Sequence, residues 1–407
     1  METKAGTGFS EHLDAKQAGS EAARRALANA GLEKCDVVFF GATPVHDPVR
    51  LLEGIREVVG AGAQLLGVSA GGMITNDALG YDGYQVGVAV LASDSMRVDL
   101  VRAEGLTDAE VECGAELGRQ ISATFRGDEA GILFMYDAVK RTALEGGPAL
   151  NLATPLIDGM HDAIEHWPAV AGMGVLGDAR FMQAAHLWHG DSVGRQRAQA
   201  AVFSGDVRMD TVILHGCKPA GRYMRITRAE QNVVLELDGK PALEVVDALF
   251  GPESGVARED YPFFLTLGVN RGDRFADFRE EHYANRLCLA LDTDRGGLVM
   301  FEPDLHTGDE VQIMHRSLDF TYIGQRIDAF MQTLDGRRPV FAIYIDCLGR
   351  AAAYSGTERE EAEEVQKHLG ALPLLGFYTG VEVASIAGHV QALDWTGVLC
   401  IYSESSR

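Results

Sequence analysis

The chain has 407 residues, of which 46% are hydrophobic and 23% charged, so it contains enough apolar side chain for about two or three globular domains and is not typical of a disordered protein. Its 36 basic and 59 acidic residues give a net charge of −23. Such a surface repels phosphate backbones and anionic lipid, and we therefore expect neither nucleic acid nor a membrane as a partner.

The amino terminus and the cysteines indicate a cytoplasmic protein. Residues 1–16 include three acidic side chains and no apolar segment, which is unlike a signal peptide. The six cysteines lie far apart without a C-x-x-C pair, which argues against a disulfide framework, a zinc knuckle and covalent haem attachment.

The first half of the sequence contains a unit of helix, buried strand, helix and glycine-bearing strand. Alanines at helical spacing over 18–30 end at Gly31, and residues 37–40 are apolar on both faces, as in strands of parallel sheet. A second helical pattern over 49–59 leads to a strand over 65–71, and residues 86–91 close the unit.

The same order of elements recurs twice. Its second copy runs from a helix that begins near Thr107 to a closing strand at 200–204, with its first buried strand at 132–136. Its third copy runs from a helix around 323–334 to a strand at 397–402. Strands separated by helices of this length predict βαβ crossovers and an α/β fold of repeated units with mostly parallel sheet.

The segment between the second and third copies has a different pattern. Short strands bounded by Gly and Asp, such as 222–227, 233–237 and 287–291, predict an antiparallel insert. We therefore expect two domains: residues 1–218 with two α/β units, and residues 219–407 with the insert followed by the third unit.

Several motifs are distinctive. In the first half these are the glycine-rich segment 67–74 and the strand 87–90, and in the second half the segment 285–314, the C-x-G-R motif at 347–350 and the G-F-Y-T segment at 376–383. They resemble motifs of the FIST family, a sensory module of bacterial signalling proteins: the first two are similar to the amino-terminal FIST signature and the others to FIST_C. Gly72, where the family often has an acidic residue, and Gly380, which does not directly precede Glu382, depart from the family pattern.

This resemblance implies a protein that senses small ligands, such as amino acids, rather than an enzyme. Because the chain ends at Arg407 soon after its last strand, we expect no transmitter domain and a signal passed to a separate protein such as a histidine kinase or cyclase. We expect no cofactor. Some family members are haem-based gas sensors, however, and His215, Tyr223, His315 and Tyr378 are conceivable axial ligands.

Two residues raise the alternative of a hydrolase or a thiol enzyme. Ser69 lies in a G-x-S-x-G sequence after a buried strand, as in a hydrolase nucleophile elbow, but the segment after it is too interrupted for the long helix that the elbow requires. Cys347 lies near Arg350, whose charge would lower a thiol pKa, although a buried packing role is the simpler interpretation. A further pair, His186 and His189, has a spacing that would let both face one side of a helix and bind a metal, but no third ligand is evident.

Ligands of parallel sheets bind beyond the carboxyl ends of the strands, where glycine-bearing loops meet. We therefore predict a ligand site lined by Ser69, Gly71, Gly72, Cys347, Gly349, Arg350, Gly376, Tyr378 and Glu382. Arg350 would bind a ligand carboxylate and Glu382 a ligand ammonium. The competing interpretation of Arg350 is a structural ion pair with a helix at 358–364.

Overall fold

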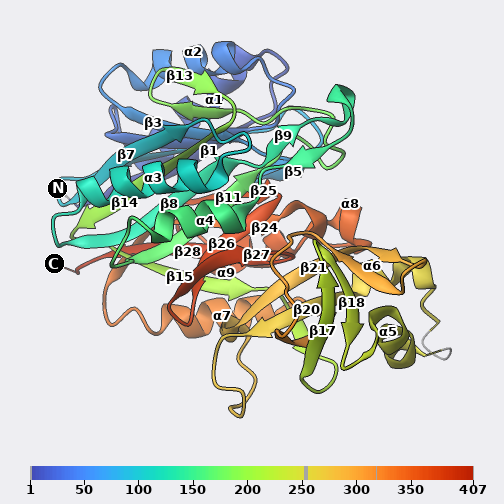
Figure 1. Ribbon diagram of the computed structural model, residues 1–407. Helices are drawn as coiled ribbons and strands as arrows, with labels where there is room; N and C mark the ends of the chain where they lie inside the picture. Colours follow the sequence, from blue (N-terminus) through green and yellow to red (C-terminus); the bar gives the residue numbers. More distant parts are fainter. Residues whose placement is uncertain (1, 252–254, 318, 407) are drawn as a thin grey trace.

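The computed structural model describes residues 2–251, 255–317 and 319–406, and it contains one α/β unit three times (Figure 1). Each unit has an outer strand, a helix, a central strand, a second helix, a strand parallel to the central one, and a returning strand. The strand order is the same in all three sheets, which confirms the predicted repeat. The sheets are mixed, because the strands that flank the second helix are parallel and their other neighbours are antiparallel.

The three units follow one another, with the insert inside the third. The first consists of β1 (Lys4–Ser10), α1 (Ala15–Ala30), β2 (Val37–Ala42), α2 (Pro48–Val59), β3 (Gln64–Ser69) and β6 (Val86–Ala92). The second consists of β7 (Met96–Glu104), α3 (Glu110–Thr124), β8 (Glu129–Asp137), α4 (Ala153–His161), β11 (Ala169–Val175) and β14 (Arg197–Gly205). The third consists of β15 (Arg208–Leu214), α7 (Thr321–Met331), β24 (Arg338–Cys347), α9 (Glu361–Leu369), β25 (Leu374–Thr379) and β28 (Gly397–Glu404).

Each unit also contributes a hairpin to the sheet of another unit. The hairpins are β4 (Gly72–Thr75) with β5 (Leu79–Tyr81), β12 (Leu187–His189) with β13 (Ser192–Gly194), and β26 (Val381–Ile386) with β27 (His389–Leu393). The first unit's hairpin pairs with β25, the second unit's with β3, and the third unit's with β11. This cyclic exchange gives each sheet six strands and ties the three units together.

The three sheets face a common apolar core, with helices on their outer faces (Figure 1). Aromatic rings from all three units meet there: the ring centroids of Phe39 and Phe203 lie 5.9 Å apart, and those of Phe203 and Phe341 lie 6.3 Å apart. Separate apolar clusters lie under α1 and α2 and under α7 and α9.

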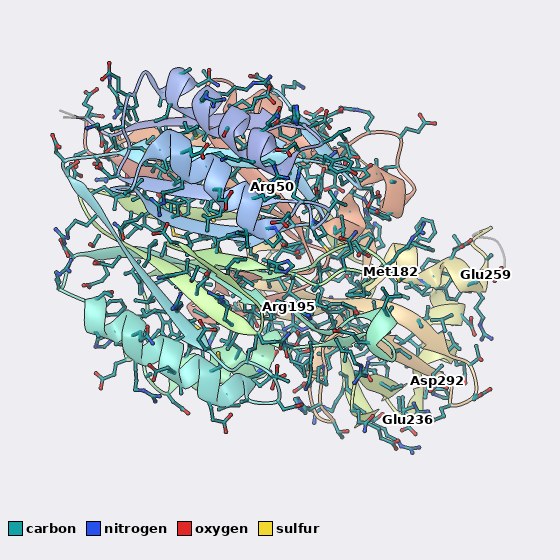
Figure 2. All side chains as sticks on the ribbon, turned by 90° about the horizontal axis from the view of Figure 1, so that it is seen from above. Arg50, Met182, Arg195, Glu236, Glu259 and Asp292 are labelled. Atoms are coloured by element: carbon teal, nitrogen blue, oxygen red, sulfur yellow. The ribbon has the colours of Figure 1, made fainter. Side chains whose placement is uncertain are left out.

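The insert forms an antiparallel sheet beside the three units, and its labelled residues Glu236, Glu259 and Asp292 lie at one side of the molecule in Figure 2. Its elements are β16 (Cys217–Pro219), β17 (Met224–Glu230), β18 (Val233–Leu237), β19 (Lys240–Pro241), α5 (Ala242–Phe250), α6 (Tyr261–Phe264), β20 (Leu265–Asn270), β21 (Tyr283–Asp292), β22 (Gly297–Met300) and β23 (Glu310–Arg316). The predicted antiparallel insert is therefore confirmed.

The helix expected near Thr107 is α3, which begins at Glu110, and the Thr107 hydroxyl donates to Gln196 Oε1 at 2.7 Å. The expected helical placement of the histidine pair was wrong. The segment with His186 and His189 is not helical, since β12 pairs there with β3. In an extended chain, residues three apart point to opposite faces, so these imidazoles do not share one.

Candidate functional site

The loops predicted to form the site lie together, but they are packed against one another. The Gly71 amide donates to the Tyr378 carbonyl at 3.0 Å, and Gly72 is opposite Tyr378 in the pairing of β4 with β25. A Cβ on Gly71 would lie 2.5 Å from Leu348. One on Gly376 would lie 2.9 Å from the Ile74 side chain. A Cβ on Gly349 would lie 3.0 Å from the Trp395 ring. The small size of these glycines therefore serves close chain packing.

Ser69 lacks the surroundings of a nucleophile. Its side chain is buried, and its Oγ accepts a hydrogen bond from the His186 backbone amide at 3.0 Å. The residues after it form strand β4 instead of the helix of a nucleophile elbow. This agrees with the structural interpretation of the turn.

Cys347 lacks the surroundings of a reactive thiol. It is buried, and this burial raises the pKa of its thiol well above the ordinary value, with a further increase from the nearby Glu382 carboxylate. Reactive cysteines need the opposite shift, because the thiolate is the nucleophile.

Arg350 is fully enclosed and bonded within the protein. Its partners are Asp346 at 3.1 Å, the carbonyls of His215 and Trp395 at 3.0 Å each, the Tyr322 hydroxyl at 3.4 Å, and Glu361. These contacts engage all five N–H donors of a guanidinium. The ion pair with Glu361 in α9 is the helix contact that the competing interpretation of Arg350 expected.

Glu382 and Tyr378 are also buried and bonded to protein groups. Glu382 accepts hydrogen bonds from the Thr379 hydroxyl and the Thr396 amide, each at 3.3 Å. Burial, and then the charge of Asp346, raises the pKa of Glu382 well above its usual range, which favours the neutral acid. The Tyr378 hydroxyl donates to Glu360 at 3.0 Å. A role for these loops in holding a ligand stays a prediction.

Besides Tyr378, two more of the conceivable haem ligands are engaged in hydrogen bonds. His215 Nε2 lies 3.0 Å from the Glu280 carbonyl, and its Nδ1 accepts from the Cys217 amide at 2.9 Å. The Tyr223 hydroxyl lies 3.1 Å from that of Tyr283. Among the residues that the structure describes, no group of three or more His, Cys, Asp or Glu is placed to hold a metal ion.

A second set of polar groups, most of them buried, lies where the insert meets the second unit. This junction cluster consists of the buried residues Tyr136, Asn285, Arg286, Glu302 and Asp394 and the half-buried Asp304. Arg286 forms an ion pair with Asp304 at 2.5 Å and donates to the Ala392 carbonyl at 2.7 Å. Glu302 accepts from the Ala153 amide at 3.0 Å, so a residue of the insert binds the start of α4 directly.

The junction cluster has more carboxylates than cations. Glu302, Asp304 and Asp394 accompany only Arg286, and burial raises the pKa of Glu302 to about 7 and that of Asp394 to about 6. Several buried atoms in it have no hydrogen-bond partner within the described part of the chain, namely Tyr136 Oη, both amide atoms of Asn285, Glu302 Oε2, Asp304 Oδ1 and Asp394 Oδ1. Buried polar atoms are usually satisfied, so a water or a ligand is expected here.

A groove opens beside this cluster, between α4, the β26–β27 hairpin and the insert. It comprises two cavities of about 270 and 360 Å³ that share Arg271, Arg286, Asp304 and His306. Thr154, Ile157, Asp158 and His161 of α4 line one wall, and residues 389–392 line another. In Figure 1 these elements meet at the boundary between the repeated units and the insert.

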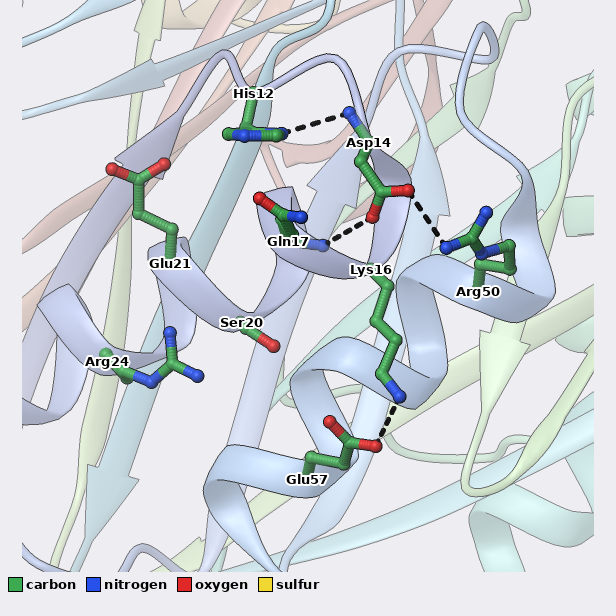
Figure 3. A pocket seen from close by; sticks show the side chains of 9 residues that line it. All are labelled: His12, Asp14, Lys16, Gln17, Ser20, Glu21, Arg24, Arg50 and Glu57. Atoms are coloured by element: carbon green, nitrogen blue, oxygen red, sulfur yellow. Dashed lines mark hydrogen bonds and ion pairs between the residues drawn. The ribbon is translucent and has the colours of Figure 1, made fainter.

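A larger hollow of about 630 Å³ lies on the outer surface of α1 and α2 (Figure 3). Its charged groups pair with one another: Lys16 lies 2.5 Å from Glu57, and Arg50 lies 2.9 Å from Asp14. Since such exposed pairs are typical of a solvated helix surface, the groove at the insert is the stronger candidate site.

Two family models match the chain. Residues 36–240 match the FIST N domain and residues 242–385 match the FIST C domain. The chain belongs to the FIST family. This membership supports a role in sensing small molecules. The proposed domain boundary at 218/219 stays a prediction.

Curated relatives of this FIST protein are uncharacterised. One from Mycobacterium tuberculosis is 25% identical over 198 residues, which are 47% of this chain and 50% of the relative. Another, from Methanocaldococcus jannaschii, is 23% identical over 223 residues, which are 54% of this chain and 42% of the relative. The matched region thus spans about half the length of these relatives.

Two solved structures are similar over almost all of the chain at low identity. Cyanuric acid hydrolase from A. caulinodans is 9% identical with a TM-score of 0.36, covering 99% of this chain and 100% of its own. A chorismatase is 9% identical with a TM-score of 0.33, covering 99% of both chains.

The groove of this FIST protein was not predicted from the sequence, although one residue, Arg286, indicated a polar site. Arg286 follows Asn285 in the mostly apolar strand β21, and its side chain is only 2% exposed. A buried arginine usually has a specific partner.

In the described residues, no helix combines the length and apolar composition needed to cross a membrane.

Proposed function

We propose that this FIST protein is a cytoplasmic sensory input protein that binds an amino-acid-like small molecule in the groove beside the insert. It then signals in trans to a separate protein such as a histidine kinase or cyclase. Family membership supports the sensory role. The loops predicted from the sequence are the alternative location for the ligand.

The observation that carries this proposal is the junction cluster at the base of the groove. Arg286 and Asp304 belong both to the cluster and to the groove lining. Unpaired buried atoms beside an opening are expected where a ligand or water completes the hydrogen bonding. A cation and a carboxylate in one lining also suit a zwitterionic ligand.

The position of the groove gives a physical route for a signal. A ligand there contacts α4 of the second unit and the insert at once, so its binding free energy favours their docked arrangement. A ligand shifts such an equilibrium only by its difference in affinity for the two states. A partner that distinguishes docked from loosened insert would therefore respond to ligand concentration.

Native mass spectrometry of freshly purified protein tests this function. We expect a retained small molecule in the wild type and its loss from Thr154→Trp, which fills the groove from α4. Asp162→Trp, at the exposed end of the same helix and outside the groove lining, should keep it. A retained molecule that is unaffected by Thr154→Trp would place the site elsewhere, and finding none in any preparation would contradict the sensory proposal.

A further inference from the structure

We propose that the groove binds a carboxylate group of its ligand through the guanidinium of Arg271. The inference rests on the proposed function, because it names the chemical class that the same groove takes. It depends on which hydrogen-bonding groups in the groove have no partner.

Arg271 has no acidic partner of its own. Its Nε donates to Gln391 Oε1 at 3.1 Å, and no carboxylate oxygen of a described residue lies within 4.0 Å of its nitrogens. The neighbouring arginines differ, since Arg286 binds Asp304 at 2.5 Å and Arg274 binds Glu310 at 2.8 Å. Arg271 therefore keeps its terminal N–H donors for another group.

The positive charge of Arg271 lies next to a second one. Desolvation, and then the charge of Arg286, lowers the pKa of Arg271, while the charges of Asp304 and Asp309 act in the opposite direction. An anion in the groove would offset both effects.

The side chain of Gln391 presents a further donor. Because Arg271 Nε can only donate, the Gln391 oxygen must face it, and the amide nitrogen must then point away from Arg271. That nitrogen is buried without a partner, as is Arg286 Nε. Gln391 and Arg286 both line the groove. The unpaired nitrogens of the lining are thus donors, which match a ligand rich in acceptors.

A carboxylate fits this arrangement better than a phosphate. Its planar pair of oxygens accepts two parallel N–H bonds from a guanidinium. A phosphate carries more negative charge and would lie close to Asp304, whose Oδ1 is itself unpaired. Like charges at short range disfavour the multiply charged anion.

Calorimetry with matched acids and amides tests the inference. The probes are succinate, pyruvate and alanine against succinamide, pyruvamide and alaninamide, at millimolar concentration. We expect saturable binding of at least one acid and not of its amide. Arg271→Gln should weaken that binding roughly 10- to 100-fold, the effect of losing one charge-assisted contact.

Two further variants test whether the terminal donors of Arg271 bind the acid. Gln391→Glu gives Arg271 an internal carboxylate and should weaken acid binding in a folded protein. Arg279→Gln is the control, because Arg279 follows on the same loop but pairs with Glu281 at 3.0 Å outside the groove.

Equal binding of acid and amide, unchanged affinity of Arg271→Gln, or no binding by any acid would each overturn the carboxylate assignment. The proposed function is judged separately. A neutral metabolite that is retained by the wild type and lost from Thr154→Trp would uphold sensing in the groove while refuting the carboxylate.

Discussion

Arg350 and Asp346 form an ion pair of 3.1 Å in which both side chains are buried. Glu361 in α9 binds the same guanidinium, and Arg316 of β23 binds Glu361 at 2.8 Å. These linked ion pairs join the third unit to the insert. It explains why an arginine after a strand end, which in sequence resembles a ligand contact, is fully enclosed here.

Replacing Arg350 should destabilise the fold. Arg350→Ala leaves Asp346 and Glu361 buried without their shared cation, and breaking a buried pair in this way typically costs about 3 to 5 kcal/mol. The free energy of unfolding, measured by urea denaturation, should fall by that amount. Arg279→Ala, which removes an exposed arginine, should change it by about 0.5 kcal/mol or less. Equal stability of Arg350→Ala and the wild type would show that the network contributes nothing.

Stability should fall as pH rises through the range in which Glu302 titrates. Burial raises the pKa of Glu302 from 4.5 to about 7, so the native state binds more protons than the unfolded state between these values. The resulting loss is on the order of 3 kcal/mol, complete above about pH 7 and absent below about pH 4.5.

The isosteric variant Glu302→Gln isolates this effect. It cannot ionise, so it should match the wild type near pH 4 and be more stable at pH 8, with urea denaturation at both pH values as the measurement. A wild-type advantage at pH 8 would mean that Glu302 is charged and favourably paired in the native state.

Close helix crossings give a third prediction. In the second unit, a Cβ on Gly159 would lie 2.0 Å from the Val111 carbonyl oxygen, and in the first unit one on Gly54 would lie 2.0 Å from that of Lys16. Gly159→Ala should therefore destabilise the protein by about 1 to 3 kcal/mol, because backbone cannot move aside as a side chain can. Gly62→Ala, which meets no atom within 4 Å, is the control in thermal unfolding. A neutral Gly159→Ala would contradict the tight crossing.

The repeated unit could be predicted because buried strands and helix patterns are local. The exchanged hairpins could not, since β4 and β12 are short and owe their pairing to another unit's sheet. Strand β1 was also missed. Its Gly6 and Gly8 give a weak strand pattern, and their lack of side chains lets α1 approach, with Ala30 N only 2.4 Å from a Cβ on Gly6.

The predicted site depended on contacts between segments that lie far apart in the sequence. The loops around Gly71 and Tyr378 meet as predicted, but for another reason: the exchanged strand β4 pairs antiparallel with β25 of the third unit. The enclosure of Arg350 by Tyr322 and Trp395 depends on contacts between distant segments of the third unit. The placing of Arg271 beside Gln391 depends on how the insert docks. That docking has no signature in the spacing of nearby residues.

Hydrogen–deuterium exchange with and without the retained or titrated ligand tests the central claim, which is ligand binding between the insert and the second unit. We predict slower exchange on binding in residues 153–161, 386–394 and 301–309, which surround the groove. Slower exchange confined to 69–72, 347–350 and 376–382, or no change in any segment, would contradict it.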